Sequence, residues 1–151
     1  MSNRGYFGIG IFEPKIEENI GTLWRSAFAM GATFVFTIGK KYKHQASDTT
    51  KSWKHIPLYH YPTLTEFCNV VPHKCQVIGI ELDKKSTKIS EFVHPERCIY
   101  LLGSERIGLS DEALLCCNDL VQLQGKYCLN VAVAGSIAMY DRINKQQQTT
   151  R

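Results

Sequence analysis

Short apolar runs alternate with helical patterns along much of the chain, and this alternation constrains the fold more than any other feature of the sequence. Apolar, aromatic and β-branched runs predict strands at 6–12, 33–38, 57–61, 76–82, 97–102 and 120–123. Helical patterns predict helices at 16–30, 63–69, 110–117 and 129–144. Because strands that alternate with helices pair in parallel, the sequence predicts an α/β fold in which helices cover both faces of a parallel sheet.

The length and composition predict one soluble domain. The chain has 151 residues, of which 44% are hydrophobic and 21% are charged, as in ordinary globular proteins. We assign residues 1–146 to a single domain and residues 147–151 to a frayed C-terminal tail. No apolar run approaches the roughly 18 residues of a membrane span, and the first residues lack the apolar core of a signal peptide. The expected location is therefore the cytoplasm, with no membrane partner.

Positive charge is concentrated in one segment, although the net charge is only +4. Five lysines fall within fifteen residues, and only Asp48 opposes them. These lysines are Lys40, Lys41, Lys43, Lys51 and Lys54. The segment is either a solvated loop or a surface that contacts phosphates and gains from the release of counterions. Arg142, Lys145 and Arg151 add weakly to the second interpretation.

The six cysteines show no metal-binding pattern. No C-x-x-C pair occurs and the histidine spacing suggests no zinc site, so we expect no bound metal. In a cytoplasmic chain such cysteines are expected to be buried small apolar residues. Cys128 is the exception, because it lies in a loop that is a candidate for ligand binding.

A loop at 101–109 in the C-terminal third has the features of a ligand site. It begins as the end of an apolar strand and leads to a helix start at Ser110. Gly103 and Gly108 permit close backbone approaches, and Glu105 lies between them. Tight polar loops after buried strands are where α/β proteins hold ligands. The first predicted strand, in contrast, lacks the glycine-rich turn that would cradle a pyrophosphate.

Two further segments carry candidate site residues. The last predicted helix is rich in small residues, which indicates tight packing on several faces: Ala132, Ala134, Gly135, Ser136 and Ala138. Asn130, at the start of this helix, either caps it or binds a ligand. Arg25 in the first helix, six residues after Asn19, is either an ordinary surface residue or a fork-shaped donor for a phosphate or a developing oxyanion.

Three segments together resemble the motifs of one family. The stretches ENIGTLWRSA (18–27), LGSERIGL (102–109) and CLNVAVA (128–134) are similar, in order and spacing, to the motifs of the SpoU/TrmH group of SPOUT RNA methyltransferases. The resemblance covers nearly the whole chain. It implies a deep trefoil knot, in which the C-terminal helix is tucked through a loop, and an obligate homodimer. It also implies S-adenosyl-L-methionine bound in a bent form, a cofactor without phosphate that needs no phosphate cradle.

The resemblance also implies, by position, two sets of site residues. The expected catalytic residues are Asn19, Arg25, Glu105 and Asn130. The residues expected to hold the cofactor are Ile80, Leu102, Gly103, Ile107, Gly108, Leu123, Cys128 and Leu129. The family reaction is methyl transfer to a ribose 2′-hydroxyl, whose oxygen must be oriented and stabilised as its proton leaves. Because arginine hardly deprotonates in proteins, we expect Arg25 to orient the hydroxyl and stabilise its charge.

The expected partners are a tRNA or rRNA substrate, contacted by the lysines between Lys40 and Lys54, and a second copy of the chain. We favour tRNA, because the sequence resembles minimal single-domain members of the family, some of which act on the tRNA anticodon loop. Cys128 stands where the family usually has serine, so one alternative is a knotted dimer that binds RNA without methylating it. Another alternative is an unknotted α/β enzyme that acts on a small molecule.

Overall fold

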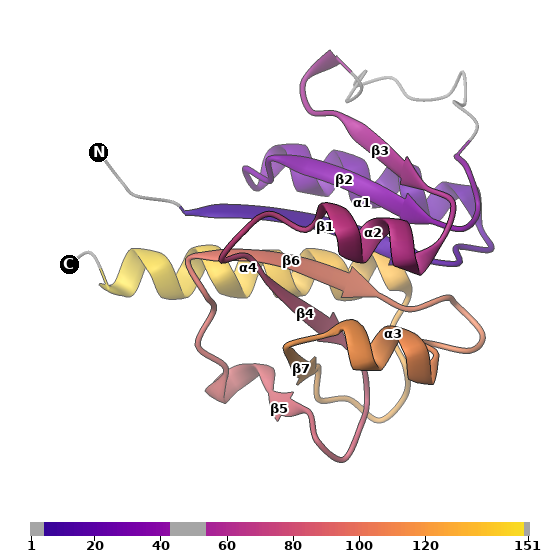
Figure 1. Ribbon diagram of the computed structural model, residues 1–151. Helices are drawn as coiled ribbons and strands as arrows, with labels where there is room; N and C mark the ends of the chain where they lie inside the picture. Colours follow the sequence, from indigo (N-terminus) through magenta and orange to yellow (C-terminus); the bar gives the residue numbers. More distant parts are fainter. Residues whose placement is uncertain (1–4, 43–53, 150–151) are drawn as a thin grey trace.

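The computed structural model, which describes residues 5–42 and 54–149, contains one seven-stranded parallel sheet (Figure 1). The strand order is β3-β2-β1-β6-β4-β7-β5. The strands are β1 (Tyr6–Phe12), β2 (Phe34–Ile38), β3 (Leu58–Tyr61), β4 (Gln76–Ile80), β5 (Thr87–Lys88), β6 (Arg97–Leu102) and β7 (Asp119–Gln122). All six strand pairs are parallel, as the alternation of strands and helices predicts.

Two pairs of helices cover the two faces of the sheet (Figure 1). Helices α1 (Glu17–Ala29) and α4 (Val131–Thr149) pack against one face, where the core includes Ile9 and Leu23. Helices α2 (Leu64–Val70) and α3 (Asp111–Cys116) pack against the other face. The predicted α/β class, with helices on both faces, is confirmed. No helix in the described ranges is long and apolar enough to cross a membrane.

The observed elements depart from the predicted ones at three places. β4 ends at Ile80, two residues before the predicted end. β5 and the single turn of 3₁₀-helix η2 (Ile89–Glu91) were not predicted, because neither has a run of apolar residues. α4 continues past its predicted end at Asn144 and ends at Thr149. The assignment of 1–146 to one domain stays a prediction.

Helix α4 packs closely against the middle of the sheet and against α1. A Cβ atom at Gly135 would lie 2.6 Å from Cδ1 of Leu23 and 2.9 Å from Cδ1 of Leu102. Both leucines are buried and cannot move aside without disturbing the core. The abundance of small residues in this helix therefore serves close packing, and it fixes the start of α4 beside the carboxyl ends of the central strands.

Arg142 is fully buried, so its interpretation as a surface cation is wrong. Its guanidinium lies 4.9 Å from the ring centroid of Phe7 and donates hydrogen bonds to the backbone oxygens of Pro95 (2.6 Å) and Glu96 (2.8 Å). It also donates to the hydroxyl of Tyr100 at 3.3 Å. Burial of this cation is tolerated because backbone oxygens at the amino end of β6 accept hydrogen bonds from its N–H groups.

His94 continues this buried network. Its two ring nitrogens lie 2.6 Å from the hydroxyl of Tyr100 and 2.7 Å from Oδ2 of Asp141. Burial lowers the pKa of His94, and it outweighs the hydrogen bond to Asp141, which acts in the opposite direction. A neutral ring that accepts from Tyr100 and donates to Asp141 satisfies both contacts. Oδ2 of Asp141 also forms a salt bridge with Nζ of Lys145, at 2.8 Å.

We expect the stability of the protein to fall as the pH drops below about 6.5. The unfolded chain takes up a proton on this histidine there, whereas the native state keeps it neutral. The expected free energy of unfolding, measured by urea denaturation, therefore declines from neutral pH to mildly acidic pH more steeply in the wild type than in His94→Gln. Glutamine has one acceptor oxygen and one donor amide group, like the neutral imidazole, but does not titrate in this range. Parallel pH profiles for the two proteins would contradict this assignment.

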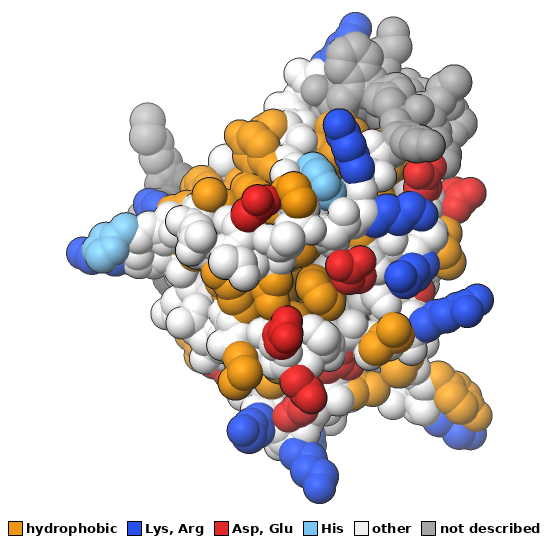
Figure 2. All heavy atoms as spheres, turned by 45° about the vertical axis from the view of Figure 1, so that its right-hand side comes forward, with side chains coloured by type: hydrophobic (Ala, Val, Ile, Leu, Met, Phe, Trp, Pro, Cys, Tyr) orange, Lys and Arg blue, Asp and Glu red, His pale blue; other side chains and the backbone are white. Residues whose placement is uncertain are grey.

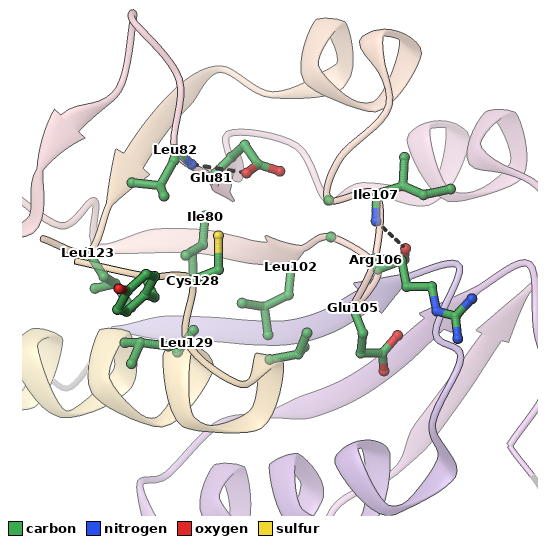
Figure 3. A pocket seen from close by; sticks show the side chains of 16 residues that line it. Ile80, Glu81, Leu82, Leu102, Glu105, Arg106, Ile107, Leu123, Cys128 and Leu129 are labelled. Atoms are coloured by element: carbon green, nitrogen blue, oxygen red, sulfur yellow. Dashed lines mark hydrogen bonds between the residues drawn. The ribbon is translucent and has the colours of Figure 1, made fainter. Parts of the chain in front are cut away.

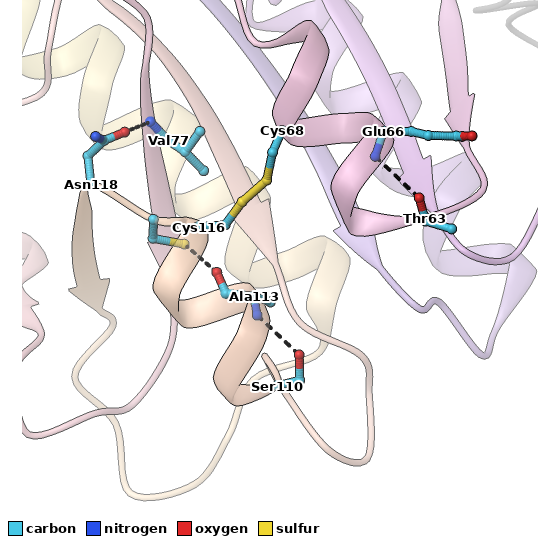
Figure 4. Close-up of a disulfide and its surroundings, with 9 residues drawn as sticks. Thr63, Glu66, Cys68, Val77, Ser110, Ala113, Cys116 and Asn118 are labelled. Atoms are coloured by element: carbon cyan, nitrogen blue, oxygen red, sulfur yellow. Dashed lines mark hydrogen bonds between the residues drawn. A yellow bond between two sulfur atoms is a disulfide. The ribbon is translucent and has the colours of Figure 1, made fainter.

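The expectation that the cysteines are buried apolar residues is confirmed only for Cys75 and Cys98. Cys68 of α2 and Cys116 of α3 form a disulfide across 48 residues of sequence (Figure 4). The two helices lie side by side on one face of the sheet, which brings these positions together (Figure 4). Nothing in the spacing of the cysteines indicates this neighbourhood, because it depends on the strand order.

Candidate functional site

A cleft of about 220 Å³ opens at the carboxyl ends of β4, β6 and β7. Its walls are the end of β4, the loop that follows β6, and the segment between β7 and α4 (Figure 3). All eight residues that the resemblance implies for cofactor binding line this cleft. Figure 3 shows Leu123, Cys128 and Leu129 at one end of the cleft and Glu105 and Arg106 at the other.

The cleft has additional lining residues that the sequence analysis missed. They are Glu81, Leu82, Ser104, Arg106, Tyr127, Val131 and Ala134. Glu81 and Leu82 had a usable signal, since they are the last residues of the strand predicted at 76–82, and ligands bind at the carboxyl ends of such strands. Tyr127 is 77% exposed and lies next to Cys128, which is also exposed. The family motif does not include it, so only the structure identifies it.

The loop after β6 is a short antiparallel turn with a fixed shape. Ser104 and Gly108 exchange backbone hydrogen bonds of 3.1 and 2.9 Å. Gly108 has a φ of +71°, and a Cβ atom at Gly103 would collide with the backbone of Gly108. Glu81 clamps the loop from β4, because its Oε2 accepts from the backbone N–H of Leu109 at 2.7 Å. These contacts give the loop one conformation.

Three of the four predicted catalytic residues are joined in one chain of hydrogen bonds. Asn19 donates from Nδ2 to Oε1 of Glu105 at 3.0 Å and accepts at Oδ1 from Nδ2 of Asn130 at 2.9 Å. Asn19 is buried, with 6% of its surface exposed. The chain ties the start of α1, the loop after β6 and the start of α4 into one rigid corner. Residues separated by 86 and 111 positions meet there.

Glu105 and Asn130 also accept hydrogen bonds from backbone N–H groups. The carboxylate of Glu105 accepts from the backbone N–H groups of Lys15 (2.8 Å) and Ile16 (3.2 Å). Burial raises the pKa of Glu105, but the hydrogen bonds outweigh it and lower the pKa overall, so the group is an anion at neutral pH. Oδ1 of Asn130 accepts from the backbone N–H groups of Ala132 and Val133, which is the capping role.

Arg25 is the predicted catalytic residue that the structure does not bring into this corner. It lies exposed on α1 and is not among the residues that line the cleft. Six residues of α-helix separate it from Asn19, or about 9 Å along the helix axis. Arg25 therefore lies on the exposed surface of α1, outside the lining of the cleft.

The predicted basic surface lies partly outside the described residues. Lys43 and Lys51 fall outside them, whereas Lys40, Lys41 and Lys54 are exposed. Lys40 follows β2 at the carboxyl edge of the sheet, and its Nζ lies 3.5 Å from the backbone oxygen of Lys15. Figure 2 shows Lys and Arg side chains gathered toward the right-hand edge of one face of the molecule. No group of three or more potential metal ligands occurs among the described side chains.

The chain matches the model of the SpoU rRNA Methylase family over residues 7–140. It therefore belongs to this family of RNA methyltransferases, as its three motifs indicate. No curated protein matches the chain in a further comparison.

Solved structures with the same fold include three informative ones. The SpoU methyltransferase AviRb from Streptomyces viridochromogenes, in complex with AdoMet, has a TM-score of 0.84 at 22% identity. The match covers 95% of this chain and only 58% of that protein. The TrmH/SpoU tRNA modifying enzyme of A. aeolicus has a TM-score of 0.84 at 19% identity, with 99% and 81% covered.

The third structure is described as giving insights into the 2-OH methylation of C/U34 on tRNA. It has a TM-score of 0.81 at 22% identity, and the match covers 98% of this chain and 99% of that one. At these identities the three structures establish the fold of the chain, and the family match establishes its class.

Proposed function

We propose that this protein transfers a methyl group from S-adenosyl-L-methionine to a ribose 2′-hydroxyl of RNA. The observation that carries the proposal is the cleft, whose walls come from the second and third motif segments. The first motif closes one end of it through the hydrogen bond from Asn19 to Glu105. Segments this far apart in the sequence meet at one edge of the sheet, which is where α/β proteins bind ligands.

The residues of the cleft fit this cofactor. Ile80, Leu102, Leu123 and Leu129 provide apolar walls for a flat adenine ring, and the backbone around Gly103 offers hydrogen-bonding groups for the adenine and the ribose. When bound, the cofactor supplies an electrophilic methyl group on a sulfonium. The protein then has to orient the accepting oxygen and help its proton to leave.

The chain's own residues divide this work between positioning and charge stabilisation. Asn19, Glu105 and Asn130 hold the loop after β6 against α1 and α4, so they are positioning residues for the cleft. Arg25 is exposed and always charged, so it suits the developing oxyanion of the ribose or an adjacent RNA phosphate.

We favour tRNA over rRNA as the substrate. The solved structure concerned with 2-OH methylation of C/U34 on tRNA matches this chain over almost the full length of both chains. The chain is similarly close to the tRNA modifying enzyme of A. aeolicus over 99% of its own length. Both matches support tRNA as the substrate.

The exposed lysines near β2 are the proposed RNA surface. Replacement of Lys41 and Lys54 together by glutamine is expected to weaken RNA binding for all sequences alike and to reduce the salt slope of log K by about 2, because each phosphate contact contributes about 1. Filter binding or fluorescence anisotropy over a range of salt concentrations measures this slope. The double variant Lys84→Gln/Lys85→Gln is a control with the same change of charge. Equal slopes in the two double variants would reject this surface.

We further propose a homodimer. Helix α4 carries an apolar stripe that the single chain leaves uncovered: Val133 is 45% exposed, Ile137 40% and Tyr140 63%. Their spacing of four and three residues places them on one face of the helix. A second copy of this face would cover the stripe, since two-fold interfaces pair identical patches.

The C-terminal knot that the family resemblance implies is also a proposal. Helix α4 packs against Leu23 and Leu102 at Gly135, and Asn130 just before it contacts Asn19. The first turns of α4 therefore lie in the middle of the fold. Such a position agrees with a segment that passes through the loop after β6.

Calorimetry with S-adenosyl-L-methionine tests the cofactor site. We expect one site for each chain in the wild type and at least about a tenfold loss of affinity in Gly103→Ala, because the added methyl group forces the turn out of shape. Gly125→Ala is the matched control, since the nearest atom to its Cβ lies 3.4 Å away. A wild-type protein that binds no cofactor would overturn the enzyme proposal and leave the RNA-binding dimer as the better account.

A further inference from the structure

A second cavity, of about 390 Å³, lies on the opposite face and at the opposite end of the sheet from the cleft. Tyr6 and Phe34 are the first residues of β1 and β2, and Pro57 directly precedes β3. The cavity thus opens at the amino ends of these strands, whereas the cleft opens at the carboxyl ends of β4, β6 and β7. A six-residue strand is about 20 Å long, so the two openings are well separated.

The cavity exists because α2 is shorter than the strands it covers (Figure 1). Its seven residues extend for about 10 Å, against about 17 Å for a five-residue strand. The helix starts just after the carboxyl end of β3 and stops at Val70 before it reaches the amino edge of the sheet. Val70, 52% exposed, forms part of the rim.

Aromatic rings form the walls of the cavity. The ring centroid of Phe34 lies 5.9 Å from that of Tyr6 and 5.7 Å from that of Tyr59. Phe34 is buried at the base, whereas Tyr59 is 47% exposed at the side. Tyr61 and Phe67 complete the wall, with their centroids 5.7 Å apart. A flat aromatic guest can stack against such surfaces, and each base–aromatic stack is worth about 1–3 kcal/mol in nucleic-acid complexes.

The polar groups in and beside the cavity indicate what kind of ligand it binds. Within residues 5–42 and 54–149, the hydroxyls of Tyr6, Tyr59 and Tyr61 have no hydrogen-bond partner. Burial raises the pKa of Tyr6 and of Tyr61, so these phenols keep their protons and remain donors. Arg97 pairs with Tyr6 in the sheet, and its guanidinium lies 5.2 Å from the ring centroid of Tyr6. Arg97 is exposed and adds a cation for a phosphate.

We propose that this cavity is a binding site for one nucleotide, whose base stacks on the aromatic wall and accepts hydrogen bonds from the tyrosines while Arg97 contacts its phosphate. A purely apolar ligand would leave the three tyrosine hydroxyls without partners, which disfavours it. The nucleotide is either a free mononucleotide or an unpaired nucleotide of an RNA. Only the RNA source rests on the proposed function.

The test is NMR of the full chain with labelled methyl groups. The methyl signals of Val70, Val71 and Ile99 report the cavity, and those of Leu123 and Leu129 report the cleft. The two probes are adenosine 5′-monophosphate and a short single-stranded oligoribonucleotide. We expect the cavity signals to shift with at least one probe. A response to the mononucleotide alone identifies a free nucleotide as the guest, and a response to the oligonucleotide alone identifies RNA.

Variants show whether the proposed contacts carry the binding. Tyr59→Ala and Arg97→Gln are each expected to weaken it about tenfold, and Tyr59→Phe, which keeps the ring, is expected to weaken it less. Leu115→Ala removes an apolar side chain that is 87% exposed and lies outside the cavity, and it serves as the control. The proposal is overturned if neither probe moves the cavity signals, if only the cleft signals move, or if Tyr59→Ala binds as the wild type does. Loss of cofactor binding alone would affect the methyltransferase proposal and leave this one intact.

Discussion

Replacement of Arg142 by methionine is expected to destabilise the native protein by about 3 kcal/mol or more. The guanidinium is fully buried and donates to the backbone oxygens of Pro95 and Glu96 and to the hydroxyl of Tyr100. Methionine fills much of the volume but leaves these acceptors buried without donors, each at about 1–3 kcal/mol. Urea denaturation followed by circular dichroism measures the change in the free energy of unfolding.

Arg97→Met is the matched control for this experiment. Arg97 also lies over an aromatic ring, but it is exposed, so its loss is expected to cost less than about 1 kcal/mol. Arg142→Lys is a second variant that keeps the charge without the fork of donors, and we expect it to recover only part of the stability. Equal destabilisation by Arg142→Met and Arg97→Met would show that the buried network contributes nothing specific.

Replacement of Arg25 by alanine is expected to lower the rate of methyl transfer by about 10²–10³, the usual loss when one donor to a developing oxyanion is removed. The affinity for S-adenosyl-L-methionine is expected to stay the same, because Arg25 does not line the cleft. Single-turnover transfer of labelled methyl groups gives the rate, and calorimetry gives the affinity.

Two controls separate this role from others. Thr22→Ala changes another exposed position of α1 and is expected to leave the rate unchanged. Arg25→Lys keeps the charge but loses the planar fork, so an intermediate rate is expected. If Arg25→Ala weakens cofactor binding as much as it slows transfer, Arg25 belongs to the cofactor site and its proposed role is wrong.

The sequence predicted the fold class because the buried strands are continuous apolar runs and the first helix has a clear period. It also predicted eight residues that line the cleft, since the resemblance supplied positions that composition and periodicity alone would not, but it missed seven others, among them Tyr127. The contact between Asn19 and Asn130 was not predictable from the pattern, because it spans 111 residues and depends on where α4 docks.

Buried polar residues were the main source of error. Arg142 lies near other cations in a polar C-terminal segment, so the pattern indicates a surface residue. Only the tertiary structure places the backbone oxygens that satisfy its donors. The disulfide between Cys68 and Cys116 was missed for a related reason, since it depends on two short helices lying on the same face of the sheet.

Mass spectrometry of nucleosides from tRNA and rRNA tests the central proposal most directly. The RNA is purified from cells that have this protein, from cells that lack it, and from cells that lack it but express Arg25→Ala. The proposal predicts that one 2′-O-methylated nucleoside disappears without the protein and does not return with Arg25→Ala, whereas the wild-type gene restores it. An identical set of 2′-O-methylated nucleosides in cells with and without the protein would contradict the proposal.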